Sequence, residues 1–256
     1  MSYPARLQER FDALGVCVIV PTYNNQKTLA DVLNALLEYT TSILVVNDGS
    51  TDDTSAILDR YTLHRIDYAP NRGKGMALRS GFMKAVEMGY SYAITIDSDG
   101  QHFAKDLPAF LDYLDQHGEC LIIGARNMNQ SSVPGKSSFG NKFSSFWYWI
   151  ETGIRLPDTQ SGYRLYPVKK MSGMQFYTRK FEFEIESIVR AAWSGIPIAQ
   201  VPVSVYYPAP GERVSHFRPF RDFTRISLLN TVLVTIAFLY IKPRDFIRML
   251  FNRDKW

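Results

Sequence analysis

The sequence predicts an α/β protein whose mostly parallel sheet is covered by helices on both faces. Short apolar runs typical of buried strands alternate with stretches of helical periodicity along the first half of the chain. Polar clusters follow three of the predicted strands, at residues 21–25, 47–50 and 97–102. Ligands bind beyond the carboxyl ends of the strands in such sheets. These observations together predict a ligand-binding α/β domain.

The individual elements follow from the same patterns. Strands are predicted at residues 16–20, 43–46, 63–68, 92–96, 121–123 and 199–207, and helices at residues 29–37, 55–61, 76–88, 107–114, 143–154 and 182–193. Residues 181–186 alternate apolar and acidic side chains, so a strand remains an alternative there. Residues 125–142 are rich in Gly, Ser, Asn and Lys and are predicted to form a loop, for which a role as a substrate lid is one candidate.

The chain of 256 residues is 46% hydrophobic, which is enough for one sizeable core. We expect a catalytic domain over residues 1–210 and a basic, apolar segment over residues 211–256, which holds nine Lys or Arg against four Asp or Glu. The two cysteines, Cys17 and Cys120, lie in apolar runs and are predicted to be buried thiols, as in a reducing compartment. The first 14 residues lack the apolar run of a signal peptide, so we expect no secretion.

Residues 226–241 carry no charge. A helix of this length is roughly 24 Å long, which is shorter than the hydrocarbon core of about 30 Å. Polar residues recur on one face of this run, and basic residues follow it. The pattern favours amphipathic helices that attach peripherally or as a re-entrant segment at the cytoplasmic face of a membrane. A core helix or a dimer helix is the alternative.

Asp97 and Asp99 follow the strand at 92–96 and are one residue apart. Two carboxylates so placed can reach one hard cation, and Gln101 adds a neutral oxygen ligand. His102 could be a further ligand or a donor to one. The alternative is an ordinary turn, because Asp-Ser-Asp-Gly also suits turns.

Two further clusters are predicted to lie beside these carboxylates. Pro21, Tyr23 and Asn25 close the first strand, and Asp48 closes the second, where they could contact a base and ribose. A turn with a helix N-cap explains residues 50–53, but Asp48 precedes that cap. Lys74 lies in Asn-Arg-Gly-Lys-Gly before a helix, a setting that favours phosphate, although a solvated loop is the alternative. The Walker spacing is absent, which disfavours ATP hydrolysis.

The order of these motifs resembles family 2 glycosyltransferases, and among them the dolichyl- or polyprenyl-phosphate mannosyltransferases and their glucosyl relatives. The resemblance covers roughly residues 16–207 and rests on six motifs: Pro-Thr-Tyr-Asn, Val-Val-Asn-Asp-Gly-Ser-Thr-Asp, Asn-Arg-Gly-Lys-Gly, Asp-Ser-Asp-Gly-Gln-His, Gly-Ala-Arg and Asp-Thr-Gln-Ser-Gly-Tyr-Arg. It implies a GT-A fold and an inverting displacement.

The resemblance also implies roles for single residues. Asp97, Asp99 and Gln101 would surround Mg²⁺ or Mn²⁺ on the donor diphosphate, and Tyr23 and Asp48 would lie at the nucleotide. Arg126 would lie near the phosphates of the donor or the acceptor. Relatives commonly have Glu where this chain has Asn25, which leaves the base open. Some relatives also carry clear transmembrane helices after the catalytic domain, where this chain has the short run at 226–241.

Two segments are candidates for contact with the acceptor. Relatives place a carboxylate near the acceptor where this chain has Asp158, which could orient the acceptor or accept its proton, and Arg164 could bind its phosphate. Asp158 could instead cap a turn. Arg213, Ser215 and His216 lie among aromatic residues before the apolar run and could hold a lipid phosphate. The sequence shows no nucleic-acid module, so RNA binding is disfavoured.

We therefore expect a hexose to be transferred from a nucleotide sugar to a polyprenyl phosphate. GDP-mannose is the first candidate donor and UDP-glucose the second. The alternatives are a family 2 enzyme that acts on a glycan or glycolipid and a non-catalytic nucleotide-sugar-binding protein. A nucleotidyltransferase is disfavoured because its Gly-rich loop is absent after the first strand.

Overall fold

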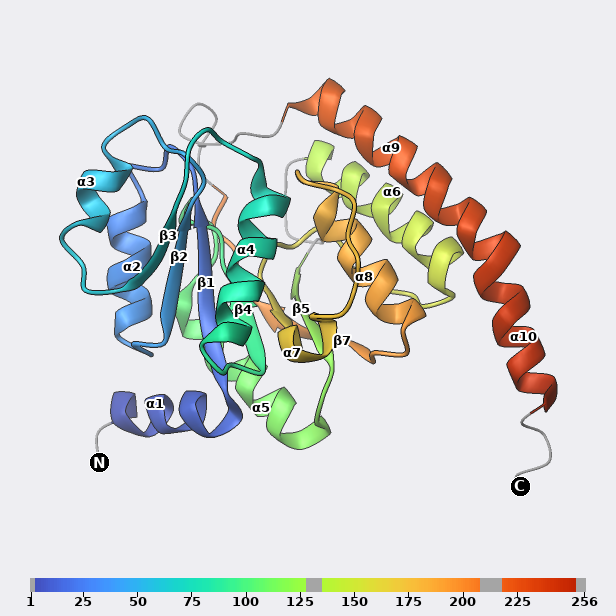
Figure 1. Ribbon diagram of the computed structural model, residues 1–256, viewed down its shortest axis with the longest axis horizontal. Helices are drawn as coiled ribbons and strands as arrows, with labels where there is room; N and C mark the ends of the chain where they lie inside the picture. Colours follow the sequence, from blue (N-terminus) through green and yellow to red (C-terminus); the bar gives the residue numbers. More distant parts are fainter. Residues whose placement is uncertain (1–2, 128–134, 208–217, 252–256) are drawn as a thin grey trace.

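The computed structural model describes residues 3–127, 135–207 and 218–251. Within these residues, seven strands form one sheet in the order β3-β2-β1-β4-β6-β5-β7. All neighbours are parallel except β6, which runs antiparallel to both β4 and β5. Helices cover both faces of this sheet (Figure 1). The predicted mostly parallel, two-sided α/β fold is confirmed.

The strands are β1 (Val16–Thr22), β2 (Ile43–Asn47), β3 (His64–Asp67), β4 (Tyr92–Thr95), β5 (Leu121–Arg126), β6 (Arg164–Tyr166) and β7 (Ile198–Val203). The helices of the domain are α1 (Tyr3–Leu14), α2 (Leu29–Leu37), α3 (Thr54–Leu58), α4 (Lys74–Glu87), α5 (Leu107–His117), α6 (Gly135–Thr152), α7 (Val168–Met171) and α8 (Phe183–Trp193), with a 3₁₀ turn at Ala104–Asp106. The C-terminal helices are α9 (Pro219–Ile236) and α10 (Lys242–Phe251), joined by a π-helical turn at Ala237–Ile241.

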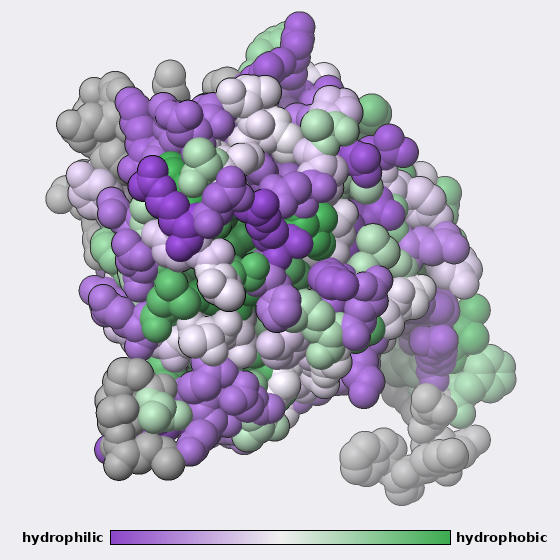
Figure 2. All heavy atoms as spheres, turned by 60° about the vertical axis from the view of Figure 1, so that its left-hand side comes forward, coloured by the Kyte–Doolittle hydropathy of each residue, from purple (hydrophilic) through white to green (hydrophobic). Residues whose placement is uncertain are grey.

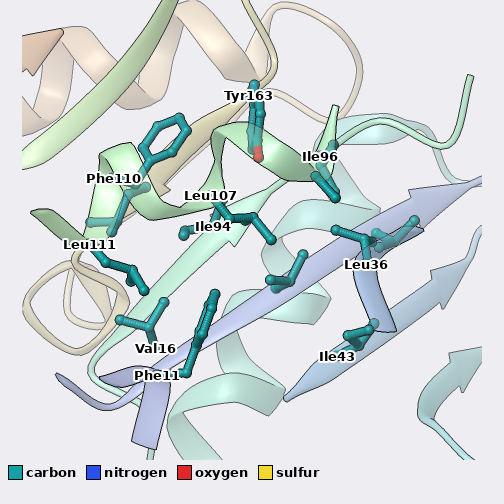
Figure 3. Close-up of a cluster of buried hydrophobic side chains, with 14 of the residues drawn as sticks. Phe11, Val16, Leu36, Ile43, Ile94, Ile96, Leu107, Phe110, Leu111 and Tyr163 are labelled. Atoms are coloured by element: carbon teal, nitrogen blue, oxygen red, sulfur yellow. The ribbon is translucent and has the colours of Figure 1, made fainter. Parts of the chain in front are cut away.

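The hydrophobic core has one part on each face of the sheet. Side chains alternate along β1, so Val16, Val18 and Val20 enter one cluster while Cys17 and Ile19 enter the other. The first cluster packs the sheet against α1, α2 and α5, as Figure 3 shows. The second packs it against α4, α6, α7 and α8. Because both faces are covered, the central strands β1, β2 and β4 are near-continuous apolar runs, and this is why the sequence revealed them.

The loop predicted at residues 125–142 is shorter than expected. Residues 135–142 form the first two turns of α6, and residues 128–134 lie outside the described residues. Helix α6 is held in place at this end because the Asn141 side chain donates to the Pro157 carbonyl oxygen at 2.7 Å. A lid over the full predicted range is therefore wrong.

The C-terminal helices form a longer helical segment than the uncharged run indicated. Phe220–Phe251 is continuous, and an 18-residue window within it has a mean hydropathy of 1.6, so the segment is long and apolar enough to cross a membrane by length and composition. Only 22% of its apolar window is buried. Helix α9 lies beside α6 and α8, with the rings of Phe143 and Phe223 5.2 Å apart (Figure 1). The opposite side of the molecule, turned forward in Figure 2, is mainly hydrophilic. The division at residue 210 stays a prediction.

Candidate active site

The polar segments that follow β1, β2, β4 and β5 meet at the carboxyl edge of the sheet. Pro21 is the link between two of them: its carbonyl oxygen accepts a hydrogen bond from the Ser98 hydroxyl at 3.1 Å. The same hydroxyl accepts from the Asn25 side-chain amide at 2.6 Å. Asn25 is buried, and its side-chain oxygen has no hydrogen-bond partner among the described residues. Tyr23, between them in sequence, is half-buried. The predicted nucleotide segment thus lies against the segment of Asp97 and Asp99.

Asp48 shapes the loop before α4. Its carboxylate accepts hydrogen bonds from the backbone N–H groups of Arg72 at 2.7 Å and Gly73 at 2.8 Å, and from the Asn71 side chain at 2.9 Å. Asp48 is 3% exposed, and burial raises its pKa despite these donors. The carboxylate therefore fixes the loop that carries Lys74. Direct contact of Asp48 with a nucleotide stays a prediction.

Lys74 begins α4 and joins two carboxylates. Its ammonium lies 2.8 Å from Asp97 Oδ1, 2.9 Å from Asp97 Oδ2 and 3.1 Å from Glu184 Oε1. Burial lowers the pKa of Lys74, but the two carboxylates more than offset this, so its pKa lies above its usual value. Burial raises the pKa of Asp97, and Lys74 reverses the shift, so this pKa lies below its usual value. Both groups are therefore charged at neutral pH.

The other predicted metal ligands are close in sequence to Asp97. Asp99 Oδ1 accepts from the backbone N–H of Gln101 at 3.0 Å, and Gln101 is buried. His102 is also buried, and burial lowers its pKa to about 4, so its imidazole is neutral at pH 7. Its Nδ1 atom has no hydrogen-bond partner among the described residues.

This donor set fits Mg²⁺ or Mn²⁺. Carboxylate and amide oxygens are the ligands that hard divalent cations prefer, and the unpartnered Nδ1 of His102 adds a neutral donor beside them. Within the described ranges, no three His, Cys, Asp or Glu side chains are already assembled around a cation position. Asp97, Asp99 and Gln101 would hold the ion together with donor phosphates.

Arg126 and Asp158 form a two-point ion pair. Arg126 Nε and Nη2 lie 2.7 Å and 2.9 Å from the two oxygens of Asp158, and the backbone N–H groups of Arg126 and Gln160 also donate to this carboxylate. Burial raises the pKa of Asp158, but Arg126 outweighs it, so the pKa is lowered. The side chain of Asp158 is fully buried. In this geometry Asp158 orients Arg126, whose side chain is 14% exposed, and a role of Asp158 near the acceptor stays a prediction.

Arg164 is enclosed by protein groups in this structure. Its side chain is fully buried on β6, and its guanidinium donates to the carbonyl oxygens of Ser161, Thr159 and Glu184 and to the Tyr166 hydroxyl. These bonds hold the turn after Asp158 to α8. In this structure Arg164 therefore supports the site from behind, and its contact with the acceptor stays a prediction. Arg213, Ser215 and His216 lie outside the described residues, so their acceptor roles stay predictions.

Two residues of this site were not assigned to it from the sequence. The sequence singled out Glu184 only together with Glu182 and Glu186, as solvated or partnered charges in a segment where relatives often have an acidic residue near the acceptor. Glu184, in the first turn of α8, shares Lys74 with Asp97. Gly162 lies so close to these groups that a Cβ atom there would be 2.7 Å from Asp97 Oδ2 and 3.0 Å from both Glu184 Oε1 and Lys74 Nζ. The Gly in Asp-Thr-Gln-Ser-Gly-Tyr-Arg was a signal for close packing, because a larger residue there would displace the ends of these three charged side chains.

Comparison with known proteins agrees with this geometry. Residues 17–172 match Glycosyl transferase family 2, which is more than half of the chain, and the chain therefore belongs to this family. It is a glycosyltransferase, as the motifs predicted, and a non-catalytic reading is set aside.

Individual relatives and solved structures make the likeness more specific. The chain is 26% identical to the UDP-N-acetylglucosamine–dolichyl-phosphate N-acetylglucosaminyltransferase of Methanococcus voltae, over 75% of this chain and 86% of that protein. It is 29% identical to the polyprenol monophosphomannose synthase of Mycolicibacterium smegmatis, over 73% and 76%. Glucosyl-3-phosphoglycerate synthase from Mycobacterium tuberculosis, solved with Mn²⁺, UDP-glucose and phosphoglyceric acid, has the same fold, with a TM-score of 0.68 at 18% identity over 92% of this chain and 84% of that one. The predicted GT-A fold is thereby confirmed.

Proposed function

We propose that the chain transfers a hexose from a nucleotide sugar to a polyprenyl phosphate at a membrane surface, with inversion at the anomeric carbon. GDP-mannose is the first candidate donor and UDP-glucose the second. Relatives named for polyprenyl- and dolichyl-phosphate acceptors support the acceptor class. The observation that carries the proposal is the exposed apolar helical segment Phe220–Phe251, which follows a family 2 glycosyltransferase domain in the same chain.

The chemistry needs a nucleophile, a leaving group and charge stabilisation. An oxygen of the lipid phosphate attacks the anomeric carbon, and the bond from that carbon to the nucleoside diphosphate breaks. When bound, Mg²⁺ or Mn²⁺ neutralises charge on the leaving diphosphate. Lys74 and Arg126 are cationic groups at the same carboxyl edge of the sheet, where each is positioned by an ion pair with a carboxylate. Positioned cations of this kind can stabilise the charge on the leaving group.

The acceptor needs positioning more than deprotonation. A phosphate monoester is already anionic at neutral pH, so no strong general base is required to activate it. The ion-paired, low-pKa state of Asp158 suits this chemistry, since a carboxylate bound to Arg126 at both oxygens is a poor base. We propose that Arg126 contacts a phosphate of the donor or acceptor while Asp158 holds its guanidinium.

The C-terminal segment supplies the membrane contact in this proposal. Phe220, Leu239 and Phe251 are 86%, 77% and 81% exposed, which is unusual for large apolar side chains unless they meet lipid or protein. Exposed basic residues, Arg221 and Arg248, occur on the same helices and suit anionic headgroups. We propose that this segment attaches to the cytoplasmic face, either peripherally or as a re-entrant segment. A protease-protection assay would distinguish this attachment from a full membrane span of the 32-residue segment.

The test is transfer of label from radioactive GDP-mannose, UDP-glucose and UDP-N-acetylglucosamine, with Mg²⁺ or Mn²⁺, to undecaprenyl phosphate. The wild type is compared with Asp99→Ala and with Asp112→Ala, a surface control on α5 that is exposed and paired with Arg10. We expect one donor to label the lipid, and Asp99→Ala alone to lose the label. Binding of a donor without labelling of the lipid would refute the lipid-phosphate acceptor and favour a glycan or glycolipid acceptor.

A further inference from the structure

The ammonium of Lys74 is shared by carboxylates from two distant parts of the chain. Asp97 follows β4, whereas Glu184 lies in the first turn of α8, 110 residues from Lys74. The three side chains are 16%, 27% and 12% exposed for Lys74, Asp97 and Glu184. The cluster is therefore partly shielded, and its charges interact more strongly than on an open surface.

The Asp97 carboxylate would be shared between the Lys74 ammonium and a divalent cation if both bound to it at the same time. Both of its oxygens lie within 2.9 Å of the Lys74 ammonium, and these are the oxygens that the proposed metal site would use. Two cations at one carboxylate repel each other, which favours the withdrawal of Lys74 when the ion binds. Glu184 gives the ammonium a second counter-charge only 3.1 Å away. Lys74 can therefore leave Asp97 without becoming a buried, unpaired charge.

The position of Glu184 is fixed by its surroundings. Its backbone carbonyl oxygen accepts hydrogen bonds from Arg164 Nη1 at 2.5 Å and from the Ser187 hydroxyl at 3.2 Å. Gly162 packs against its carboxylate, where a Cβ atom would come within 3.0 Å of Oε1. Arg164 thus contributes to the site by anchoring Glu184. With its backbone fixed in this way, Glu184 presents its carboxylate to Lys74 from a set position.

We propose that Glu184 is a positioning residue that holds Lys74 when Asp97 turns to the divalent cation, so that the ammonium faces the donor diphosphate. The inference rests on the proposed function, because it requires a nucleotide sugar with a metal ion at this edge. Lys74 occupies the metal-binding carboxylate in the free enzyme and gives it up on binding. The ordinary alternative is an ion pair that merely joins α4 to α8.

The test measures binding rather than turnover. Mn²⁺ affinity is determined by electron paramagnetic resonance, alone and with GDP or UDP, for the wild type, Lys74→Met, Glu184→Gln and the double variant. The matched controls are Lys84→Met and Glu87→Gln, which break an exposed ion pair on the same helix, α4. Glu184→Asp keeps the charge, and thermal unfolding of every variant shows whether it is folded.

Lys74→Met should bind Mn²⁺ alone about tenfold more tightly, because a competing cation is removed, and should bind the nucleoside diphosphate more weakly. Glu184→Gln should weaken nucleoside diphosphate binding at saturating Mn²⁺ by about tenfold when Lys74 is present, and by less than about twofold in the Lys74→Met background. Simple electrostatics predicts the opposite sign, since removing a carboxylate should favour an anion. Glu184→Asp should recover part of the loss.

Two results would overturn the inference while leaving the proposed function intact. In the first, the wild type binds GDP or UDP together with Mn²⁺, and Glu184→Gln changes this affinity no more than the control Glu87→Gln does. The other is an equal loss in both Lys74 backgrounds, which would show that Glu184 acts independently of Lys74. Failure of the wild type to bind any nucleoside diphosphate with Mn²⁺ or Mg²⁺ would instead refute the proposed function.

Discussion

Glu151 on α6 provides a test of how this fold handles a buried carboxyl group. The side chain is 1% exposed, and neither carboxylate oxygen has a hydrogen-bond partner among the described residues. Burial alone raises its pKa from 4.5 to about 8. The backbone carbonyl of Glu151 accepts from the Trp193 indole at 3.0 Å, so the residue lies at the junction of α6 and α8. Its carboxyl group is therefore mostly protonated at neutral pH.

The effect on stability follows from the direction of this pKa shift. The folded protein holds the Glu151 proton more tightly than the unfolded chain does, so unfolding releases a proton between about pH 4.5 and pH 8. Stability is therefore greatest below pH 4.5 with respect to this group and falls as pH rises towards 8. With one pKa unit corresponding to about 1.4 kcal/mol, the free energy of unfolding should fall by about 3 kcal/mol between pH 5 and pH 8.

Glu151→Gln should remove this contribution, because the amide does not titrate. The assay is urea unfolding followed by circular dichroism from pH 5 to pH 8, with Glu87→Gln, an exposed glutamate on α4, as the control. Other groups also titrate: His102, with its pKa lowered to about 4, makes stability rise with pH between about 4 and 6.5. The difference between wild type and variant cancels that term. Parallel pH profiles for the wild type and Glu151→Gln would refute the reasoning.

Three further predictions follow from the geometry. Gly162→Ala should lower Mn²⁺ affinity by about tenfold, because the new methyl group would lie 2.7 Å from Asp97 Oδ2; an unchanged affinity by electron paramagnetic resonance would contradict this. Leu239→Asp should reduce flotation with vesicles that contain anionic lipid, whereas Met83→Asp, which alters a 60% exposed apolar side chain on α4, should not; equal flotation of the two would argue against a membrane-facing α9–α10. Arg164→Met should lower the free energy of unfolding by about 3 kcal/mol, since it leaves buried carbonyl oxygens unpaired; urea unfolding within 1 kcal/mol of wild type would show that water replaces the guanidinium.

The sequence was most informative about the parallel strands. The central strands β1 and β2 are short apolar runs between turn residues, and burial on both sides makes those runs continuous, whereas the edge strand β3 is mostly exposed. It was least informative about β6, which has three residues, Arg164–Tyr166, and pairs antiparallel between β4 and β5. A strand this short has no periodicity to detect, and its pairing depends on contacts about 70 and 40 residues away in sequence. The strand's Arg164 was therefore interpreted as a ligand-binding residue.

The same limit applies to Glu184. Residues 181–186 alternate apolar and acidic side chains, which suits a strand as well as a helix, and the structure begins α8 at Phe183. In a helix Glu184 and Ser187 share a face, whereas in a strand Glu184 would share its face with Glu182 and Glu186. Only the helix places Glu184 beside Lys74 while Glu186 turns to the backbone N–H groups of Tyr177 and Thr178.

The motifs therefore indicated which residues lie at the site more reliably than they indicated what each residue contacts. Asp48, Asp158 and Arg164 all belong to motifs, and all three have their polar atoms bound by protein groups. Buried charges of this kind persist where paired groups fix a geometry, since an unpaired charge would be costly. Asp48 fixes the loop of Lys74, and Asp158 fixes Arg126. The two cations that we propose to face a diphosphate, Lys74 and Arg126, are thus each held by a carboxylate, so loss of either carboxylate should misplace the cation that it holds.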